Sequence, residues 1–478
     1  MPKDLRHFLA KVEAEMPDDI ARIKKVTDPR FEVTAVQQHL ENNNQFPLVY
    51  FEQMKNLKGQ VSDFRLVSNL FASRQKVALA LDLPAEQWRM EPAFEYANRA
   101  ANPIKPIIVD HKDAPVHEVV RTGDQVDLYD LPVITHHTMD GNPYLVDAVV
   151  AADPETGIHN SSHHRQLIKG KNQAGIWMSP RHLWNYVQRA HALGKPLPFA
   201  HVHGAHPAFY LGTEALVPME WDEYDVIGGI LGEPLRLVPS VSFGDKLMIP
   251  ADAEVVVEGE ILPDRDAEGP FGEFTGYYGP QRWGPLCRIT AITHRRDPIW
   301  VNILVGHPDT SILGGIPKEA GTYNAVKAAL PGVQKVHFPI SGCCRFSAYI
   351  SIKQRVDGEA LTAALAALPH HDELKLVVVV DDDVDPFNER EVMWSVATRV
   401  QAGTDVNIIR NARGGSLDPS AVRHAVGDKM IIDATRPIDR AYSDRITVPA
   451  DVMQRIKIDD LIEYGPAGFL EKAGLVRR

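Results

Sequence analysis

Four apolar residues near the start of the chain recur with the i, i+3, i+4, i+7 spacing of one helix face: Leu5, Phe8, Leu9 and Val12. This spacing predicts an amphipathic first helix. A strand-like run at 47–51, a helix-like run at 66–83 and a short apolar run at 106–109 follow. Because helix-like and strand-like runs alternate, we expect residues 1–115 to form a small α/β domain.

The pattern changes between residues 116 and 315, where short strand-like runs alternate with turns rich in Gly, Pro and Asp. Residues 144–152 and 158–162 flank an Asp-Pro-Glu-Thr-Gly turn, which predicts a hairpin. Further expected elements are strands at 254–262, 287–293 and 299–305 and a helix at 181–193. This segment is predicted to be a β-rich barrel or sandwich with helical insertions.

Strand-like and helix-like runs alternate again in the last segment, residues 316–478. The predicted elements are strands at 346–352 and 375–380 and helices at 358–368 and 388–401. Such alternation favours an α/β sandwich. An Asp-Asp-Asp-Val-Asp run at 381–385 follows the second strand, and we expect a structural or interdomain role for it.

Composition excludes several classes of protein. Of 478 residues, 44% are hydrophobic and 24% charged, so the chain can bury large cores. At about 150 residues per domain, this length suggests about three domains. The 51 Lys and Arg against 63 Asp and Glu give a net charge of −12. Nucleic-acid binding needs clustered cations, so we do not expect nucleic acid as a partner.

The apolar runs are too short to cross a membrane. A run such as 376–380 is far below the roughly 20 residues that a bilayer requires. Lys3, Asp4 and Arg6 interrupt any apolar signal segment at the start of the chain. The three cysteines form no Cys-x-x-Cys pair. We therefore expect a soluble, cytoplasmic protein without membrane insertion, a disulfide framework or a thiolate metal site.

The most unusual short segment is Glu268-Gly-Pro-Phe-Gly-Glu273. Two carboxylates bracket a tight turn, a spacing that can direct both acids into one cleft. One acid would then suit proton donation and the other charge pairing. Glycines also serve exposed turns, so a solvated surface turn is the alternative.

A second polar cluster, Asn160-Ser-Ser-His-His-Arg165, ends the predicted hairpin. Asn and Ser oxygens can bind hard cations or phosphate, and Arg165 can grip a carboxylate with two hydrogen bonds. An ordinary polar strand end is the alternative. His182 and Glu223 are single residues, and each by itself is typical of a structural or solvated side chain.

Together and in this order, these motifs resemble the UbiD family of prenylated-FMN-dependent decarboxylases. An Asn-x-Ser-x-x-Arg pattern falls on Asn160, Ser162 and Arg165, and the Glu-Gly-Pro-Phe-Gly-Glu signature is complete. The family's metal-binding His matches His182, which follows Arg181. The family's metal-binding Glu, five residues beyond a Val-Pro pair, matches Glu223, which follows Val217-Pro218. Segments 126–144, 381–385, 393–399 and 429–435 also resemble family members. Separate motifs that agree in family order are stronger evidence than any one motif.

The resemblance implies a multidomain α/β fold. A central split β-barrel like that of flavin reductases, at 116–315, would bind the cofactor. An N-terminal α/β domain (1–115) and a C-terminal α/β sandwich that mediates oligomerisation (316–478) would flank it. The protein would be a homo-oligomer, either a dimer or a hexamer.

The implied activity is reversible, non-oxidative decarboxylation of an aromatic, heteroaromatic or α,β-unsaturated carboxylic acid, which releases or fixes CO₂. Prenylated FMN, made by a flavin prenyltransferase, would form a covalent adduct with the substrate. The implied metal ligands are Asn160, His182 and Glu223, which would hold Mn²⁺ or Mg²⁺ next to the cofactor phosphate, and K⁺ is expected nearby. The expected cofactor contacts are Asn160, Ser162, Arg165, Arg181, His182, Pro218 and Glu223.

Catalysis falls, by the same resemblance, to Arg165, Glu268 and Glu273. Arg165 would hold the substrate carboxylate or pair with Glu268, a role that suits a rigid guanidinium. Glu273 would protonate the carbon after CO₂ leaves, so it must carry a proton part of the time.

Several residues depart from the family pattern. Arg181 stands where relatives often have Gln, and His163 and His164 stand where small or apolar residues are frequent. With Met178 and Phe274, these histidines are candidates for the substrate pocket. The added cations suggest a polar or anionic substituent on the substrate, and a packing role is the alternative. The second acid is Glu where the polyprenyl-hydroxybenzoate branch commonly has Asp, so a role in ubiquinone synthesis does not follow.

Two other functions stay open from the sequence. One is a conventional FMN-dependent oxidoreductase, although no Gly-x-Gly-x-x-Gly fingerprint follows a strand. The other is a non-catalytic or partner-dependent subunit of a larger carboxylase complex, against which the complete set of acids, arginine and metal ligands counts.

Overall fold

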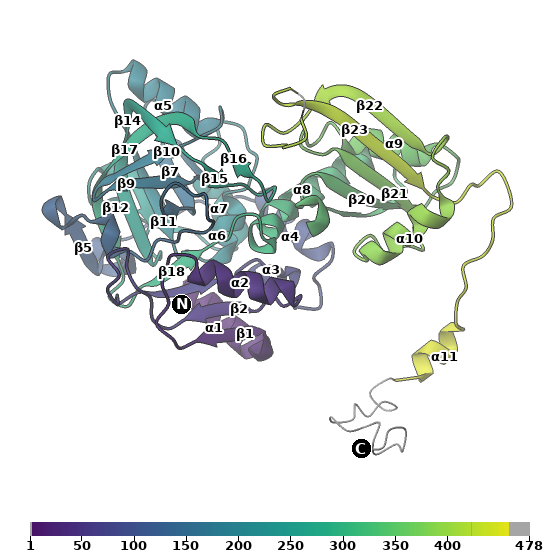
Figure 1. Ribbon diagram of the computed structural model, residues 1–478, viewed down its shortest axis with the longest axis horizontal. Helices are drawn as coiled ribbons and strands as arrows, with labels where there is room; N and C mark the ends of the chain where they lie inside the picture. Colours follow the sequence, from purple (N-terminus) through teal and green to yellow (C-terminus); the bar gives the residue numbers. More distant parts are fainter. Residues whose placement is uncertain (1, 422, 458–478) are drawn as a thin grey trace, which may run out of the picture. The chain divides into compact units, whose positions relative to one another are not determined.

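A computed structural model describes residues 2–421 and 423–457 (Figure 1). Contacts divide the chain into two units, Met1–Thr435 and Arg436–Arg478. The second unit includes one described helix, α11 (Ala450–Arg455). All elements below belong to the first unit. The predicted domain boundaries near residues 115 and 315 stay a prediction.

A four-stranded sheet and four helices build the N-terminal region in the described part of the chain. The sheet has the order β1 (Ile20–Ile23), β2 (Leu48–Phe51), β3 (Arg65–Ser68) and β18 (Ile299–Asn302). The helices are α1 (Leu5–Glu15), α2 (Glu32–Asn42), α3 (Arg74–Ala80) and α4 (Glu91–Ala100). The predicted first helix is confirmed, because Leu5, Phe8 and Val12 are buried along one face of α1.

Two predictions for this sheet are wrong. The helix expected over 66–83 is divided, because residues 65–68 form a buried strand between β2 and β18 and Ser73 caps a helix that begins at Arg74. The strand expected near 299–305 does not join the barrel. After the turn that follows residue 294, the chain crosses over and β18 pairs with β3 in parallel, where all four of its residues are buried.

A nine-stranded sheet forms the central region of the described chain. Its strands are β5 (Val119–Thr122), β6 (Tyr144–Leu145), β7 (Ala148–Ala152), β8 (His159–His163), β9 (Gln166–Gly170), β10 (Gln173–Ile176), β11 (Leu197–His203), β14 (Val255–Glu268) and β17 (Arg282–His294). Every pairing in it is antiparallel, and the sheet curls into a half-barrel (Figure 1). The predicted hairpin is confirmed, since β7 pairs with β8.

Smaller elements surround this sheet. They are β4 (Ile107–Ile108), β12 (Arg236–Ser240), β13 (Gly244–Pro250), β15 (Phe271–Gly272), β16 (Tyr278–Gly279), α5 (His182–Ala192), α6 (Pro207–Gly212) and α7 (Glu223–Leu231). Short 3-10 turns lie at Pro17–Asp19, His111–Asp113, Pro115–His117, Gly123–Gln125, Leu128–Asp130 and Ile340–Gly342. The helix predicted at 181–193 is confirmed as α5.

The C-terminal region has a five-stranded sheet within the described residues. Its order is β19 (Val333–His337), β20 (Ser347–Ile352), β21 (Leu376–Asp381), β23 (Val426–Ala434) and β22 (Val406–Arg413). Its helices are α8 (Pro308–Ala329), α9 (Glu359–Ala367) and α10 (Glu389–Arg399). The predicted strands and helices between 346 and 401 are confirmed. The sequence pattern carries no clear signal for α8, because Pro317 and three glycines lie inside it.

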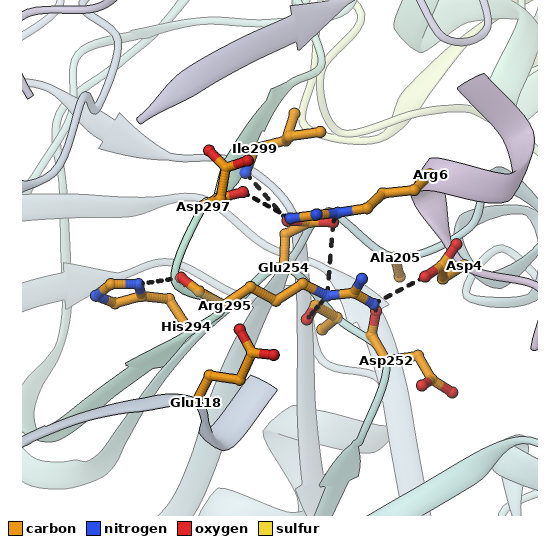
Figure 2. A network of polar contacts seen from close by, with 12 residues as sticks. Asp4, Arg6, Glu118, Ala205, Asp252, Glu254, His294, Arg295, Asp297 and Ile299 are labelled. Carbon is orange, nitrogen blue, oxygen red and sulfur yellow. Dashed lines mark hydrogen bonds and ion pairs between the residues drawn. The ribbon is translucent and has the colours of Figure 1, made fainter. Parts of the chain in front are cut away.

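Two ion-paired positions connect these elements. Arg399 of α10 pairs with Asp381 (2.6 Å) and Asp383 (2.9 Å) at the end of β21, so the aspartate run has the structural role that we expected. At the other end of the chain, Arg6 of α1 donates to both oxygens of the buried Glu254 (Figure 2). This second network ties α1 to the start of β14. No helix in the described residues is long and apolar enough to cross a bilayer.

Candidate functional site

One arginine and two glutamates form a buried network at the edge of the half-barrel. Arg165, between β8 and β9, donates from Nε to Glu268 Oε1 (2.8 Å) and from Nη2 to Oε2 (3.2 Å). Its Nη1 also donates to Glu273 Oε1. Although burial alone lowers it, the hydrogen bonds and charges of the two glutamates raise the pKa of Arg165 above its ordinary value. The structure therefore joins the three residues to which the family resemblance assigns catalysis.

The two acids do not lie on a solvated turn. Glu268 is 0% exposed and Glu273 is 8% exposed, so that alternative is wrong. The Arg165 guanidinium lies over the rings of Phe271 (4.9 Å) and Trp177 (5.3 Å), which keep it from water. A charged group in such surroundings interacts more strongly with its partners than it would in water.

The chain reaches this arrangement through two glycines. Glu268 ends β14, and Gly269 takes φ of +95°, a conformation that a side chain would oppose. At Gly279 of β16, a Cβ would overlap the carboxylate of Glu273. The glycines therefore let the acid segment turn back on itself and let Glu273 lie against the backbone of β16.

A buried aspartate fixes the backbone next to Glu273. Asp140 Oδ1 accepts from the N–H of Gly272 (3.2 Å), and Oδ2 accepts from the N–H of His137 (2.8 Å). Burial raises the pKa of Asp140, although the N–H groups that it binds lower it. Tyr144 Oη also donates to the carbonyl of Pro270 (3.2 Å). Sequence reasoning missed Asp140, and its position directly before Gly-Asn-Pro-Tyr was the available signal.

The three predicted metal ligands converge on one carboxylate. Glu223 Oε1 accepts from Asn160 Nδ2 (2.8 Å) and lies 3.2 Å from His182 Nδ1. Its Oε2 accepts from the N–H of Ser161 (2.6 Å). Ser162 donates to Asn160 Oδ1 (3.1 Å). The residues come from β8 and from the first positions of α5 and α7, so two helix N-termini face the same place.

This donor set fits a divalent ion with oxygen and nitrogen ligands. No group of three or more His, Cys, Asp or Glu side chains is placed to hold a metal among the described residues. The cluster at Glu223 reaches three ligands only through the amide of Asn160. Helix N-termini also attract anions such as phosphate.

The other predicted positions are less closely grouped. Arg181, the N-cap of α5, and Pro218, in the loop before α7, are exposed. His164 Nε2 lies 3.0 Å from Ser162 Oγ, and burial lowers the pKa of His164 to about 4. Met178 is 7% exposed and belongs to the hydrophobic core. The cofactor and pocket assignments of these residues stay predictions.

Two further pocket candidates lead to residues that the sequence did not single out. His163 stacks on Tyr210 and lies 4.0 Å from Glu214. Phe274, directly after Glu273, packs against Phe346, and the guanidinium of Arg345 covers its ring. Glu214 and Arg345 come from distant segments, so spacing alone carried no signal for them.

Comparison with known families covers most of the chain. Three models of 3-octaprenyl-4-hydroxybenzoate carboxy-lyase match: the N-terminal domain at 13–89, the Rift-related domain at 107–308 and the C-terminal domain at 311–434. All three belong to UbiD. Together they span the region that holds every residue of the two clusters.

Individual relatives agree. The chain is 35% identical to a phenolic acid decarboxylase of Sedimentibacter hydroxybenzoicus, over 93% of this chain and 94% of that protein. It is 35% identical to an anhydromevalonate phosphate decarboxylase of Methanothermobacter thermautotrophicus, over 81% of this chain and 89% of that protein.

Solved structures show the same likeness. The UbiD-class enzyme HmfF from Pelotomaculum thermopropionicum, in complex with FMN, superimposes with a TM-score of 0.88 at 37% identity, covering 96% of this chain and 100% of that one. An evolved dimeric form of HmfF in complex with prFMN gives 0.85 at 35% identity, with coverage of 96% and 100%. The chain therefore belongs to the UbiD family and is an enzyme of the carboxy-lyase class.

Proposed function

We propose that this enzyme catalyses reversible, non-oxidative decarboxylation of an aromatic, heteroaromatic or α,β-unsaturated acid, with prenylated FMN and a divalent metal. The observation that carries the proposal is the buried Arg165 shared by Glu268 and Glu273. Two relatives support the proposal: one is a phenolic acid decarboxylase, and the other is a UbiD-class enzyme whose structure contains prFMN.

The cofactor and metal have a candidate place at the cluster around Glu223. Asn160, His182 and Glu223 would hold Mn²⁺ or Mg²⁺, and the N-termini of α5 and α7 would attract the cofactor phosphate. When bound, the prenylated flavin supplies the electron sink for the carbon that loses CO₂. Expectations of K⁺ nearby and of a homo-oligomer rest on the family resemblance.

The two acids would divide the work of proton transfer. Glu268 receives two hydrogen bonds from Arg165 and is fully buried, so a proton on it would break a bidentate ion pair. Glu273 is bound to Arg165 through one oxygen, so it can accept a proton while the guanidinium keeps its pairing with Glu268. Glu273 would then donate its proton to the substrate carbon after CO₂ leaves.

The walls of the site support this chemistry. Trp177 and Phe271 cover Arg165 and limit the access of water, which would otherwise compete as a proton donor. Arg282, the first residue of β17, lies over the ring of Trp177 (4.6 Å) and packs against this side of the site. Substrate would therefore meet a fixed, desolvated acid rather than solvent.

The test uses protein co-expressed with a flavin prenyltransferase. We expect the prenylated-flavin spectrum, bound metal at about one per chain, and exchange of labelled CO₂ into at least one acid of a panel of aromatic, heteroaromatic and acrylic acids. His182→Ala should lose metal without loss of fold. Unmodified FMN with NAD(P)H-driven reduction and no CO₂ exchange would contradict the proposal and favour an oxidoreductase. Exchange only after addition of a second subunit would favour a partner-dependent enzyme.

A further inference from the structure

Two cations meet at Gly314 of α8, and one of them lies over Phe274, the residue that follows the proposed proton donor. The first is Lys318 of α8, whose Nζ donates to the carbonyl of Gly314 (2.7 Å). No carboxylate oxygen among the residues that the structure describes lies within 4.0 Å of this ammonium group. Burial lowers the pKa of Lys318 to about 8, so the side chain is mostly protonated at neutral pH. An ammonium group has three donors, and only one of those of Lys318 has a hydrogen-bond partner within the described residues.

The second cation is Arg345, whose guanidinium lies 4.5 Å from the centre of the Phe274 ring. A Cβ at Gly314 would overlap this guanidinium, so the glycine leaves the space that it occupies. Its hydrogen bond to the carbonyl of Cys343 is long (3.4 Å), and the nearest carboxylate, Glu373, is 3.8 Å away. Within residues 2–421 and 423–457, most of the five donors of Arg345 are therefore without a close protein acceptor.

Glu214 connects these cations with the site. Burial alone raises the pKa of Glu214, but Lys318 and other nearby cations hold it below its ordinary value. The other cations are His163, Arg345 and Arg181. His163 Nε2 has no hydrogen-bond partner in the described structure, and this residue lies on the strand that leads to Arg165. Lys318, Arg345 and Arg181 thus outnumber the two local carboxylates, Glu214 and Glu373.

We propose that Lys318 and Arg345 form an anion subsite that binds a second acidic group of the substrate, a carboxylate or a phosphate. The inference rests on the proposed decarboxylase function and narrows its substrate class to acids with two anionic groups. One group would leave as CO₂ near Glu273, and the other would stay fixed between α8 and the Phe274 ring. Two charge-assisted hydrogen bonds there would set the orientation of the substrate.

Binding measurements test this subsite without turnover. Flavin-loaded protein is titrated calorimetrically with benzoate, isophthalate, terephthalate and 4-phosphonobenzoate. We expect at least one of the doubly acidic ligands to bind roughly tenfold or more tightly than benzoate, as charge-assisted hydrogen bonds allow. The phosphonate arm distinguishes a phosphate-bearing substrate from a dicarboxylate.

Variants then assign that preference. Lys318→Met and Arg345→Met should each bring the affinity for the preferred doubly acidic ligand to within about threefold of that for benzoate. Lys318→Arg should retain the preference. Lys327→Met is the matched control, because Lys327 lies near the exposed end of the same helix and donates to the carbonyl of Pro331. This control should bind all four ligands as the wild type does.

Several outcomes would overturn the subsite. One is an unchanged preference in both Met variants. Another is loss of bound flavin from Lys318→Met at an unchanged melting temperature, which would assign the cations to the cofactor phosphate. The wild type could instead prefer doubly acidic ligands through Lys318 and exchange no CO₂. That result would support the anion subsite and contradict the proposed decarboxylase function.

Discussion

Two buried networks in this molecule use the same residue types in opposite proportions. In the first network, the carboxylate of Glu254 pairs with two arginines (Figure 2). Arg6 donates from Nε to Oε1 (2.7 Å) and from Nη2 to Oε2 (2.9 Å), and Arg295 Nε lies 3.6 Å from Oε1. Around Arg165, one guanidinium serves two carboxylates. Both networks join distant segments of the chain, and both central residues are buried.

The difference lies in the balance of charge. Near Glu254, Asp4 also accepts from Arg295 (3.0 Å), and the N–H of Ile299 donates to the second Glu254 oxygen (3.1 Å). Each of these charged groups has a partner of opposite charge, so the network stabilises the packing of α1. Around Arg165, two negative charges face one positive charge. The proposed function uses this imbalance, because it assigns proton transfer to the carboxylate that Arg165 holds through one oxygen only.

The sharpest test of the comparison is Glu273→Gln, which removes the extra carboxylate and keeps its shape. We expect decarboxylation to fall about 10³-fold, within the range that general acid catalysis contributes. Bound flavin should remain, because Glu273 is not among the proposed metal ligands. Turnover is followed by CO₂ release and flavin by absorbance. Glu260→Gln, at an exposed pair with Arg288 on the same pair of strands, is the control and should leave turnover unchanged. Full activity in Glu273→Gln would contradict the assignment.

The matching change in the other network is Glu254→Gln. It removes the carboxylate charge that Arg6 and Arg295 share at a fully buried position, so we expect the free energy of unfolding to fall by about 3 kcal/mol. The urea midpoint should drop accordingly, while kcat/KM of the folded fraction stays within twofold. A tenfold loss of kcat/KM at an unchanged midpoint would erase the distinction between the two networks.

Asp140→Asn should have a smaller effect on catalysis. The amide retains one acceptor oxygen but no longer binds two N–H groups, so the backbone at Gly272 loosens beside Glu273. We expect kcat to fall about tenfold with KM and flavin content unchanged, because a shift of the acid affects the reacting geometry rather than binding. Asp127→Asn, which removes a carboxylate at a cap on the N–H of Tyr129 outside the site, serves as control. A rise in KM with constant kcat would exclude this positioning role.

The weakest expected effect concerns pH and the cations near Phe274. Lys318 has a pKa lowered to about 8 by burial, so it is charged below that pH and neutral above it. Affinity for the preferred doubly acidic ligand should therefore fall several-fold as pH rises from 7 to 9, with the midpoint near 8. The groups that face Lys318 are Arg345, Arg181, Glu214, Glu373 and His371, which is paired with Glu373. Lys318→Met should lack this step, and a step of the same size in that variant would assign it to another group.

Much of this protein follows from local sequence. The spacing of Leu5, Phe8 and Val12 determines α1, because one buried face suffices for a helix. The alternation after residue 346 determines the order of strands and helices in the C-terminal sheet. The motifs around Asn160 and Glu268 indicated the UbiD family, since their residue types and order are specific even when their contacts are unknown. The helix α8 and the true start of α3 were beyond such patterns, because tertiary packing overrides weak propensity at Pro317 and at 65–68.

Contacts between distant residues were decided only by the tertiary structure. Arg165 meets its two acids across 103 and 108 residues, and spacing along the chain cannot show that one guanidinium binds both. The same holds for Asp140 under Gly272 and for the cations beside Phe274. The sequence by itself determined which chemical groups are present and the family to which they belong. The fold decided which charges are balanced, because balance depends on burial and on neighbours that only the folded chain brings together.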